Sequence, residues 1–163
     1  LERMGGKISI YNKRHETNDI IVDITAEYSH LKPINISGDI ISDLIDELPI
    51  LFIVCAVCEG ISHINNIEEL RFKESDRIKS MESGLNILGI KTESTQSSIK
   101  IHGGEFTGGI VDSYGDHRVA MAFSIAALVS KKPITVLNTE NVSTSFPNFI
   151  DSLIDIGAEI YES

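Results

Sequence analysis

The sequence is poor in basic side chains. It carries 14 lysines and arginines against 24 aspartates and glutamates, which gives a formal net charge of -10 at pH 7. The basic residues form neither a block nor a stripe, and nucleic acids and anionic membranes attract proteins mainly through such positive surfaces. The composition therefore argues against both as partners. Any anionic ligand must be held by a local cluster of cations.

Long hydrophobic runs are also missing. A membrane helix needs about 20 consecutive apolar residues, and the apolar run at residues 50–57 is far shorter. The N-terminus does not show the charged and then apolar pattern of a signal peptide. We therefore expect a cytoplasmic protein with no contact to a membrane.

Cysteine is scarce, which bears on redox and metal chemistry. The only two cysteines, Cys55 and Cys58, lie in or next to the apolar run. No second Cys/His pair at ligand spacing accompanies them, so a zinc or redox role is the less favoured alternative. We interpret both as small buried hydrophobic residues, and we expect neither a metal nor a cofactor.

The residue pattern predicts a mixed α/β fold. Strands are expected at 7–11, 19–25, 61–67, 90–93, 98–102, 134–137 and 158–161, helices at 50–58, 75–88, 117–129 and 146–156, and a glycine-rich loop at 103–115. The order strand, strand, helix, strand, helix then occurs twice, in two similar repeats of about 5–89 and 89–163. In each repeat one helix is apolar all round and should be central, and the other is amphipathic and should be peripheral.

Three glycines mark the expected helix ends. Gly5, Gly89 and Gly157 each follow the last residue of a helical pattern and precede a strand-like segment, which is typical of a helix C-terminus. Since Leu1 to Gly5 resembles only the last turn of a helix, we expect the chain to be a piece of a longer polypeptide.

The stretch 71–78, Arg-Phe-Lys-Glu-Ser-Asp-Arg-Ile, concentrates charged and hydroxyl side chains just before an amphipathic helix. With Ser75 or Glu74 as the helix cap, Lys73 and Arg77 flank the helix start. Free backbone N–H groups and the positive end of the helix dipole lie there too, which favours a phosphate or carboxylate site. The alternative is a solvated first turn without a ligand.

Charged residues also begin the two apolar helices. Asp46 precedes the first, while Asp116, His117 and Arg118 open the second. Asp116 is a good N-cap residue. An arginine at the positive end of a helix needs an anion, so Arg118 is expected to meet either a structural carboxylate or a ligand.

Two segments, Arg71 to Arg77 and Gly115 to Ala122, together resemble the signatures of the 5-enolpyruvylshikimate-3-phosphate synthase family. The segments Asp46-Glu47-Leu48-Pro49 and Ser145-Phe146-Pro147 are also similar to that family. The resemblance implies an inside-out α/β lobe, with helices inside and sheets outside, in which residues 1–163 form most of the C-terminal lobe of a two-lobe enzyme. The missing N-terminal lobe would belong to the same polypeptide.

The resemblance also implies a reaction. Family members transfer the enolpyruvyl group of phosphoenolpyruvate to the 5-hydroxyl of shikimate 3-phosphate and release phosphate, without a metal, in aromatic amino-acid biosynthesis. Both substrates are anionic, and arginine suits planar carboxylates and phosphates. By this resemblance, Arg77 and Arg118 hold phosphoenolpyruvate, Lys73 and Asp46 bind shikimate 3-phosphate, and Asp46 accepts the proton of the attacking hydroxyl. Glu74 relays a proton to or from the methylene carbon.

Each role has a simpler alternative, and two positions depart from the family pattern. Asp46 and Glu74 are also ordinary acids at helix starts. Thr144 stands where many relatives carry a lysine, and Glu69 stands where some carry an asparagine. The competing functions are a sister enzyme of the same fold that uses a UDP-sugar, and a non-catalytic anion-binding module. Because the other lobe is expected to supply further cations and to close the cleft, we expect the isolated lobe to be inactive.

Overall fold

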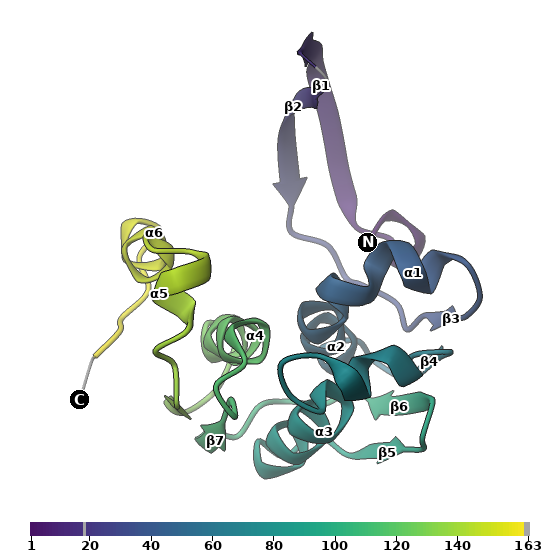
Figure 1. Ribbon diagram of the computed structural model, residues 1–163, viewed down its shortest axis with the longest axis vertical. Coiled ribbons are helices and arrows are strands. Elements are labelled where there is room, and N and C mark those ends of the chain that lie inside the picture. Colours follow the sequence, from purple (N-terminus) through teal and green to yellow (C-terminus); the bar gives the residue numbers. More distant parts are fainter. Residues whose placement is uncertain (18, 162–163) are drawn as a thin grey trace.

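A computed structural model describes residues 1–17 and 19–161, and two apolar helices form its centre (Figure 1). Helix α2 (Leu48–Ala56) has Pro49 in its first turn and packs against α4 (His117–Ala127). Proline is tolerated there because its missing N–H would have no partner in the helix anyway. Both helices contribute to one hydrophobic core, with Phe52 and Phe123 fully buried.

Helix α3 (Arg77–Ile87) packs on both central helices. It approaches α4 closely at Gly84, where an added Cβ would lie 2.2 Å from the ring of Phe123. Gly84 is therefore required by the packing. Residues Ile78, Met81 and Leu85 of α3 are fully buried, as the amphipathic pattern predicted.

The strands form three separate groups. Strands β3 (Asn35–Ile36), β4 (Ile61–Asn65), β6 (Ser98–His102) and β5 (Thr92–Ser94) make one sheet in the order β3-β4-β6-β5, in which β3 and β4 are parallel and the other pairs antiparallel. Strands β7 (Gly109–Asp112) and β8 (Ile134–Leu137) form a parallel pair. The mixed α/β class expected from the sequence is confirmed, and helices at the centre with strands at the periphery are consistent with the expected inside-out lobe.

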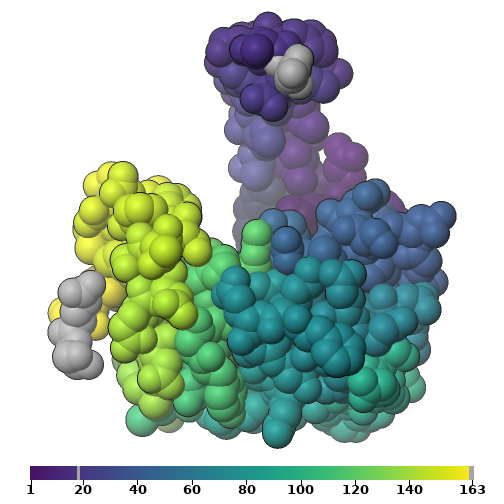
Figure 2. Space-filling model, viewed as in Figure 1, coloured from purple at the N-terminus to yellow at the C-terminus, as the bar shows by residue number. Residues whose placement is uncertain are grey.

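The third group is a long hairpin that projects from the rest of the molecule (Figures 1 and 2). It consists of β1 (Lys7–Glu16) and β2 (Asp19–Glu27), which are antiparallel. The predicted pair of strands joined by a turn is confirmed, although both strands are longer than predicted. On one face Ile10 lies opposite Ile24, and the two are 61% and 62% exposed.

Several predicted elements were wrong in detail. The glycine-rich loop contains strand β7. The helix expected at 146–156 is shorter, at α6 (Phe149–Asp155), and a separate short helix, α5 (Val142–Ser145), precedes it. Pro147 lies between them, and proline disfavours a helical conformation at the residue before it. Strands expected at 90–93 and 158–161 are replaced by β5 at Thr92–Ser94 and by irregular chain up to residue 161.

The short helix α1 (Ile40–Leu44) was not predicted. The expected boundary near residue 89 does not separate two sheets, because β6 follows it and pairs with β4, which precedes it. The two-repeat organisation stays a prediction. The three predicted helix-ending glycines all have positive φ, with Gly89 at 90°. Within the described residues, every helix is too short or too polar to span a membrane.

The starts of α2, α3 and α4 meet at one end of the molecule. A 3-10 turn (Ile45–Glu47) leads into α2, and its Asp46 lies beside Arg77 of α3 and Arg118 of α4. These three distant segments therefore converge. Their convergence places the charged residues singled out in the sequence into one cluster.

Candidate active site

A buried ion pair forms the base of this cluster. Arg77 and Asp116 are 2% and 0% exposed, and Nε of Arg77 donates to Oδ2 of Asp116 over 2.8 Å. Ser75 donates to the same carboxylate oxygen. Oδ1 of Asp116 accepts from the backbone N–H groups of Arg118 and Val119, so Asp116 is the predicted N-cap of α4.

The ionisation of Asp116 follows from these contacts. Burial alone would raise the pKa of Asp116, but the hydrogen bond and charge of Arg77, with the two backbone N–H groups, outweigh it and lower the pKa. Asp116 is thus a carboxylate at neutral pH. It fixes Arg77 and the start of α4 in one arrangement.

Asp46 lies next to Arg77 of this pair and contacts three cations. Its Oδ1 accepts from Nη1 of Arg77 at 3.1 Å and lies 3.8 Å from Nζ of Lys73, while its Oδ2 lies 3.9 Å from Nη2 of Arg118. Partial burial raises the pKa of Asp46, whereas the Arg77 hydrogen bond and the charges of Arg118, Lys73 and Arg77 lower it, and the net shift is downward. The side chain remains 49% exposed, so a ligand can reach this carboxylate.

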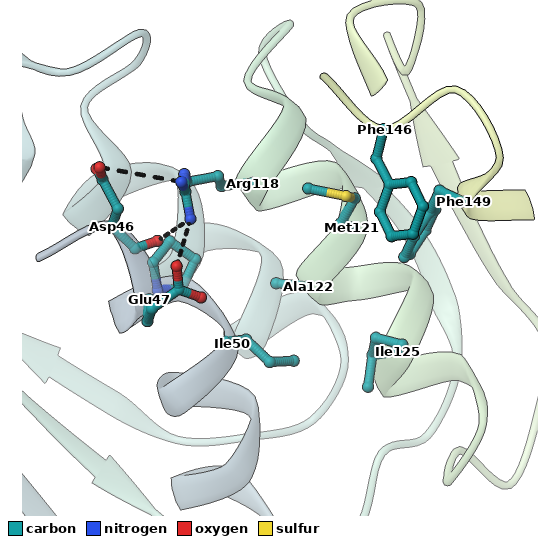
Figure 3. Close-up of a pocket in the computed structure, with 10 residues that line it drawn as sticks. Asp46, Glu47, Ile50, Arg118, Met121, Ala122, Ile125, Phe146 and Phe149 are labelled. Carbon is teal, nitrogen blue, oxygen red and sulfur yellow. Dashed lines mark hydrogen bonds and ion pairs between the residues drawn. The ribbon is translucent and has the colours of Figure 1, made fainter. Parts of the chain in front are cut away.

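Arg118 extends from the first turn of α4 towards the start of α2 (Figure 3). Its Nη1 donates to the backbone carbonyl of Asp46 at 2.8 Å and to Oε1 of Glu47 at 2.9 Å. Arg118 was expected to meet a structural carboxylate or a ligand, and Glu47 is such a carboxylate. Because the side chain is 29% exposed, Arg118 is far more accessible than Arg77.

A pocket of about 200 Å³ opens beside Arg118. Figure 3 shows its apolar wall between α2 and α4, with the charged residues at one end. The lining residues are Asp46, Glu47, Pro49, Ile50, Arg118, Met121, Ala122, Ile125, Phe146 and Phe149. The pocket thus has an apolar wall and a cation, Arg118, at one end.

Lys73 completes the group of cations. Its Nζ contacts Oε1 of Glu69 at 2.6 Å in addition to Asp46 at 3.8 Å. Glu69, which the resemblance placed where some relatives carry an asparagine, serves here as a partner of Lys73. The lysine is 24% exposed and lies on the same side of Asp46 as Arg77, since both contact Oδ1.

Glu74 is paired with His117. Oε2 of Glu74 and Nδ1 of His117 are 2.7 Å apart, and Oε1 of Glu74 lies 3.9 Å from Nη2 of Arg77. The carboxylate is about half exposed and the imidazole is 15% exposed. The carboxylate and the imidazole thus form a hydrogen-bonded pair at the edge of the site.

Glu74, Asp116 and His117 also bring their ligand atoms within 4.8 Å of one another, which is close enough to share a metal ion. However, both oxygens of Asp116 already accept two hydrogen bonds each, and one of the donors is Arg77. A carboxylate offers about four lone-pair sites in total. The arrangement therefore fits an internal hydrogen-bond network better than a metal site.

The start of α3 differs from the sequence prediction. Asp76 caps this helix, since its side chain accepts from the backbone N–H of Lys79 at 3.0 Å, so the expectation of Ser75 or Glu74 as cap was wrong. Both carboxylate oxygens of Asp76 also accept from Nη1 of Arg71. Ser75 and Glu74 instead turn towards Asp116 and His117 of α4.

The five residues assigned to the site from the sequence, Asp46, Lys73, Glu74, Arg77 and Arg118, all belong to this cluster. Sequence reasoning assigned no role to His117 or to Glu47. His117 could have been found from its place between Asp116 and Arg118. Glu47 carried no such signal, because its contact with Arg118 joins residues 71 positions apart.

Comparisons with known proteins identify close relatives of this chain. Residues 1–153 match the family model of EPSP synthase (3-phosphoshikimate 1-carboxyvinyltransferase). A 3-phosphoshikimate 1-carboxyvinyltransferase from Coxiella burnetii is 41% identical over 160 residues, which are 98% of this chain and 36% of the relative. One from Legionella pneumophila is 43% identical over 150 residues, 92% of this chain and 35% of the relative. This chain thus spans about a third of the length of these relatives.

Solved structures give the same result. EPSP synthase from Acinetobacter baumannii matches with a TM-score of 0.91 and 41% identity, and the match covers 95% of this chain and 37% of that one. The enolpyruvyl transferase NikO from Streptomyces tendae matches with a TM-score of 0.71 and 22% identity over 99% of this chain and 34% of that one. At that identity the second likeness shows a common fold alone.

Proposed function

The chain belongs to the EPSP synthase (3-phosphoshikimate 1-carboxyvinyltransferase) family, and on that premise we propose that the protein containing it transfers the enolpyruvyl group of phosphoenolpyruvate to the 5-hydroxyl of shikimate 3-phosphate. The products are 5-enolpyruvylshikimate 3-phosphate and phosphate. This is a step of the shikimate pathway towards aromatic amino acids. We also propose a cytoplasmic location.

The observation that carries the proposal is the contact of one carboxylate with three cations from two segments that are distant from it in the sequence. Asp46 lies within 4 Å of Lys73, Arg77 and Arg118, at contact distances of 3.8, 3.1 and 3.9 Å. Substrates with phosphate and carboxylate groups need several fixed cations close together. A group that accepts a hydroxyl proton must lie beside them, and Asp46 does.

In the proposed mechanism, Arg118 binds an anionic group of phosphoenolpyruvate and Lys73 binds shikimate 3-phosphate near its reacting hydroxyl. The hydroxyl oxygen attacks C2 of phosphoenolpyruvate and its proton passes to Asp46, while the methylene carbon takes a proton from Glu74. The resulting tetrahedral intermediate then loses phosphate as the methyl group returns a proton to Glu74, and the departing phosphate takes up the proton from Asp46. Each proton transfer of this kind typically contributes about 10²- to 10⁴-fold in rate.

Binding of the anionic substrates also tunes Asp46 as a base. Arg118, Lys73 and Arg77 lower the pKa of Asp46 in the free site, which makes it a weak base. An anionic ligand on Arg118 and Lys73 neutralises part of that positive charge and raises the pKa again. Asp46 therefore becomes more basic when the substrates are in place.

We propose that Arg77 contacts phosphoenolpyruvate less extensively than Arg118 does. With 2% of its side chain exposed and its Nε and Nη1 bound to Asp116 and Asp46, it offers mainly Nη2 to a ligand. We propose that Arg77 contributes one hydrogen bond and a fixed positive charge to phosphoenolpyruvate, and that Arg118 makes the larger contact.

The chain spans about 36% of its Coxiella burnetii relative, and we propose that the remaining polypeptide supplies a second lobe with further cations. Closure of the two lobes would exclude water and strengthen every charged contact in the site. This chain alone is then expected to bind phosphate or phosphoenolpyruvate only weakly and to show no turnover.

The experiment is phosphate release from phosphoenolpyruvate and shikimate 3-phosphate. The full-length protein, this chain alone, and this chain mixed with the rest of the polypeptide are assayed in parallel. Turnover is expected from the first and the third. Turnover by this chain alone would contradict the two-lobe account, and acceptance of a UDP-sugar in place of shikimate 3-phosphate would assign the protein to a different enolpyruvyl transfer.

A further inference from the structure

We infer that Glu47 is an internal competitor for Arg118, which an anionic ligand must displace, and that it sets the affinity of the site for such ligands. This inference rests on the proposed function and adds to it a residue that governs binding. Glu47 has no role in the reaction itself.

The contact between the two residues has the form of a ligand contact. Nη1 of Arg118 donates to Oε1 of Glu47 at 2.9 Å, which is the distance expected for a guanidinium bound to the carboxylate or phosphate of a ligand. Glu47 thus occupies a donor of Arg118 that an anionic group of the substrate would otherwise use. Figure 3 shows this contact at the charged end of the pocket.

Nη1 of Arg118 has two hydrogen-bond acceptors, and a ligand can displace one of them more easily than the other. The backbone carbonyl of Asp46 is held by the 3-10 turn before α2. The Glu47 side chain is 62% exposed, and within residues 1–17 and 19–161 Arg118 is the only group with which it forms a hydrogen bond or ion pair. Rotation of the Glu47 side chain into solvent therefore breaks a single contact.

The contact between Arg118 and Glu47 is weak enough for a ligand to displace it. Exposed ion pairs contribute little to stability, because solvent screens them and because two side chains must be held in place. An incoming phosphate or carboxylate that binds Arg118 in a two-pronged manner makes a stronger contact. Removal of the charge of Glu47 is expected to strengthen anion binding about three- to tenfold, since the competing contact with Arg118 loses its charge assistance.

The buried partner of Arg77 provides the contrast. Asp116 is fully buried and accepts four hydrogen bonds, so no ligand can displace it. Glu47 accepts one hydrogen bond and is exposed to solvent, whereas Asp116 accepts four and is buried. The displaceable carboxylate is therefore the one on Arg118.

The test uses the full-length protein with Glu47→Gln, which keeps the size of the side chain and removes its charge. The matched control is Glu105→Gln, because Glu105 is also exposed and paired with a cation, Lys131, outside the site. Calorimetric titration with inorganic phosphate and with phosphoenolpyruvate gives Kd, and steady-state kinetics give KM and kcat separately.

We expect Kd for both anions and KM for phosphoenolpyruvate to fall about three- to tenfold in Glu47→Gln, with a smaller change in kcat and no change in Glu105→Gln. In an Arg118→Gln background, Glu47→Gln should have no further effect on phosphate binding. Weaker or unchanged phosphate binding in Glu47→Gln, the absence of phosphate binding, or the same gain without Arg118 would each overturn the inference.

The phosphate titration does not require turnover. If the full-length protein binds phosphate more tightly in Glu47→Gln but does not convert phosphoenolpyruvate and shikimate 3-phosphate, the competition is correct and the proposed function is wrong. If turnover is normal and phosphate affinity does not rise, the proposed function stands and the competition is wrong.

Discussion

The two arginines at the helix starts have similar sequence contexts but lie in different environments. Arg77 and Asp116, which we call the inner pair, are almost completely buried, whereas Asp46, Glu47, Lys73 and Arg118, which we call the outer rim, are between 24% and 62% exposed. Breaking a buried ion pair is costly, but an exposed pair contributes little. The inner pair therefore holds the starts of α3 and α4 together, and we propose that the outer rim exchanges partners for a ligand.

The largest expected effect is on catalysis and comes from the rim. Asp46→Ala in the full-length protein should lower kcat about 10²- to 10⁴-fold, because it removes the proposed proton acceptor, and it should change KM less. Steady-state kinetics separate the two parameters. Asp43→Ala is the control, since Asp43 is also an exposed acid just before α2. A normal kcat with a raised KM would make Asp46 a substrate ligand only.

The next largest effect is on stability and comes from the inner pair. Asp116→Ala leaves the charge of Arg77 buried without its main partner, which typically costs about 3 to 5 kcal/mol, and it removes the cap of α4. Chemical denaturation of the full-length protein measures this loss. Replacement of both partners, as Arg77→Met with Asp116→Leu, should recover part of it, because no buried charge remains. A loss of less than about 1 kcal/mol in Asp116→Ala would show that the pair is not structural.

The variant Arg118→Lys tests whether the inner pair and the outer rim differ in function. A two-pronged contact becomes a point contact, so kcat/KM for phosphoenolpyruvate should fall on the order of 10²-fold, whereas the melting temperature should change little. Arg77→Lys should lower both. Thermal unfolding and steady-state kinetics of the two variants decide this. Equal loss of stability in both variants would remove the distinction between inner pair and outer rim.

How much of this could be predicted from the sequence depends on the range of the interactions. Local signals predicted the helices that carry the site, because apolar periodicity, Pro49, Asp116 and the glycine stops act within a few residues. They failed where distant partners decide the structure. Strand β7 begins at the second of two adjacent glycines and was assigned to a loop, and its pairing with β8 across some 25 residues makes it a strand.

The division of labour between the two arginines could not be predicted either. Both lie in the first turn of a helix and next to acidic residues, and the sequence does not show which one is buried. Arg77 is buried because Asp116, 39 positions away, and Asp46, 31 positions away, converge on it. The resemblance to a family pointed to residues that the structure brings together, but it did not distinguish the buried Arg77 from the more exposed Arg118.

The smallest expected effect is on the dependence of stability on pH. It comes from Cys55, a buried residue outside the site. Burial raises the pKa of the Cys55 thiol on α2 from 9.0 to about 11. The folded state therefore keeps the thiol proton to a higher pH than the unfolded state does. The stabilisation that this difference provides is complete below pH 9 and is lost as the pH rises from 9 to 11. The loss should be about 2 to 3 kcal/mol. Denaturation of Cys55→Ala across this range should show a smaller slope, and an equal slope would exclude Cys55 as the cause.

The central claim is that the outer rim exchanges its partners for the ligand while the inner pair stays in place. A crystal structure of the full-length protein with phosphoenolpyruvate and shikimate 3-phosphate bound tests it most directly. The account predicts that Nη1 of Arg118 leaves Oε1 of Glu47, now 2.9 Å away, for an anionic group of a ligand, and that Nε of Arg77 remains about 2.8 Å from Oδ2 of Asp116. Ligands that leave the contact between Arg118 and Glu47 intact, or that separate Arg77 from Asp116, would contradict it.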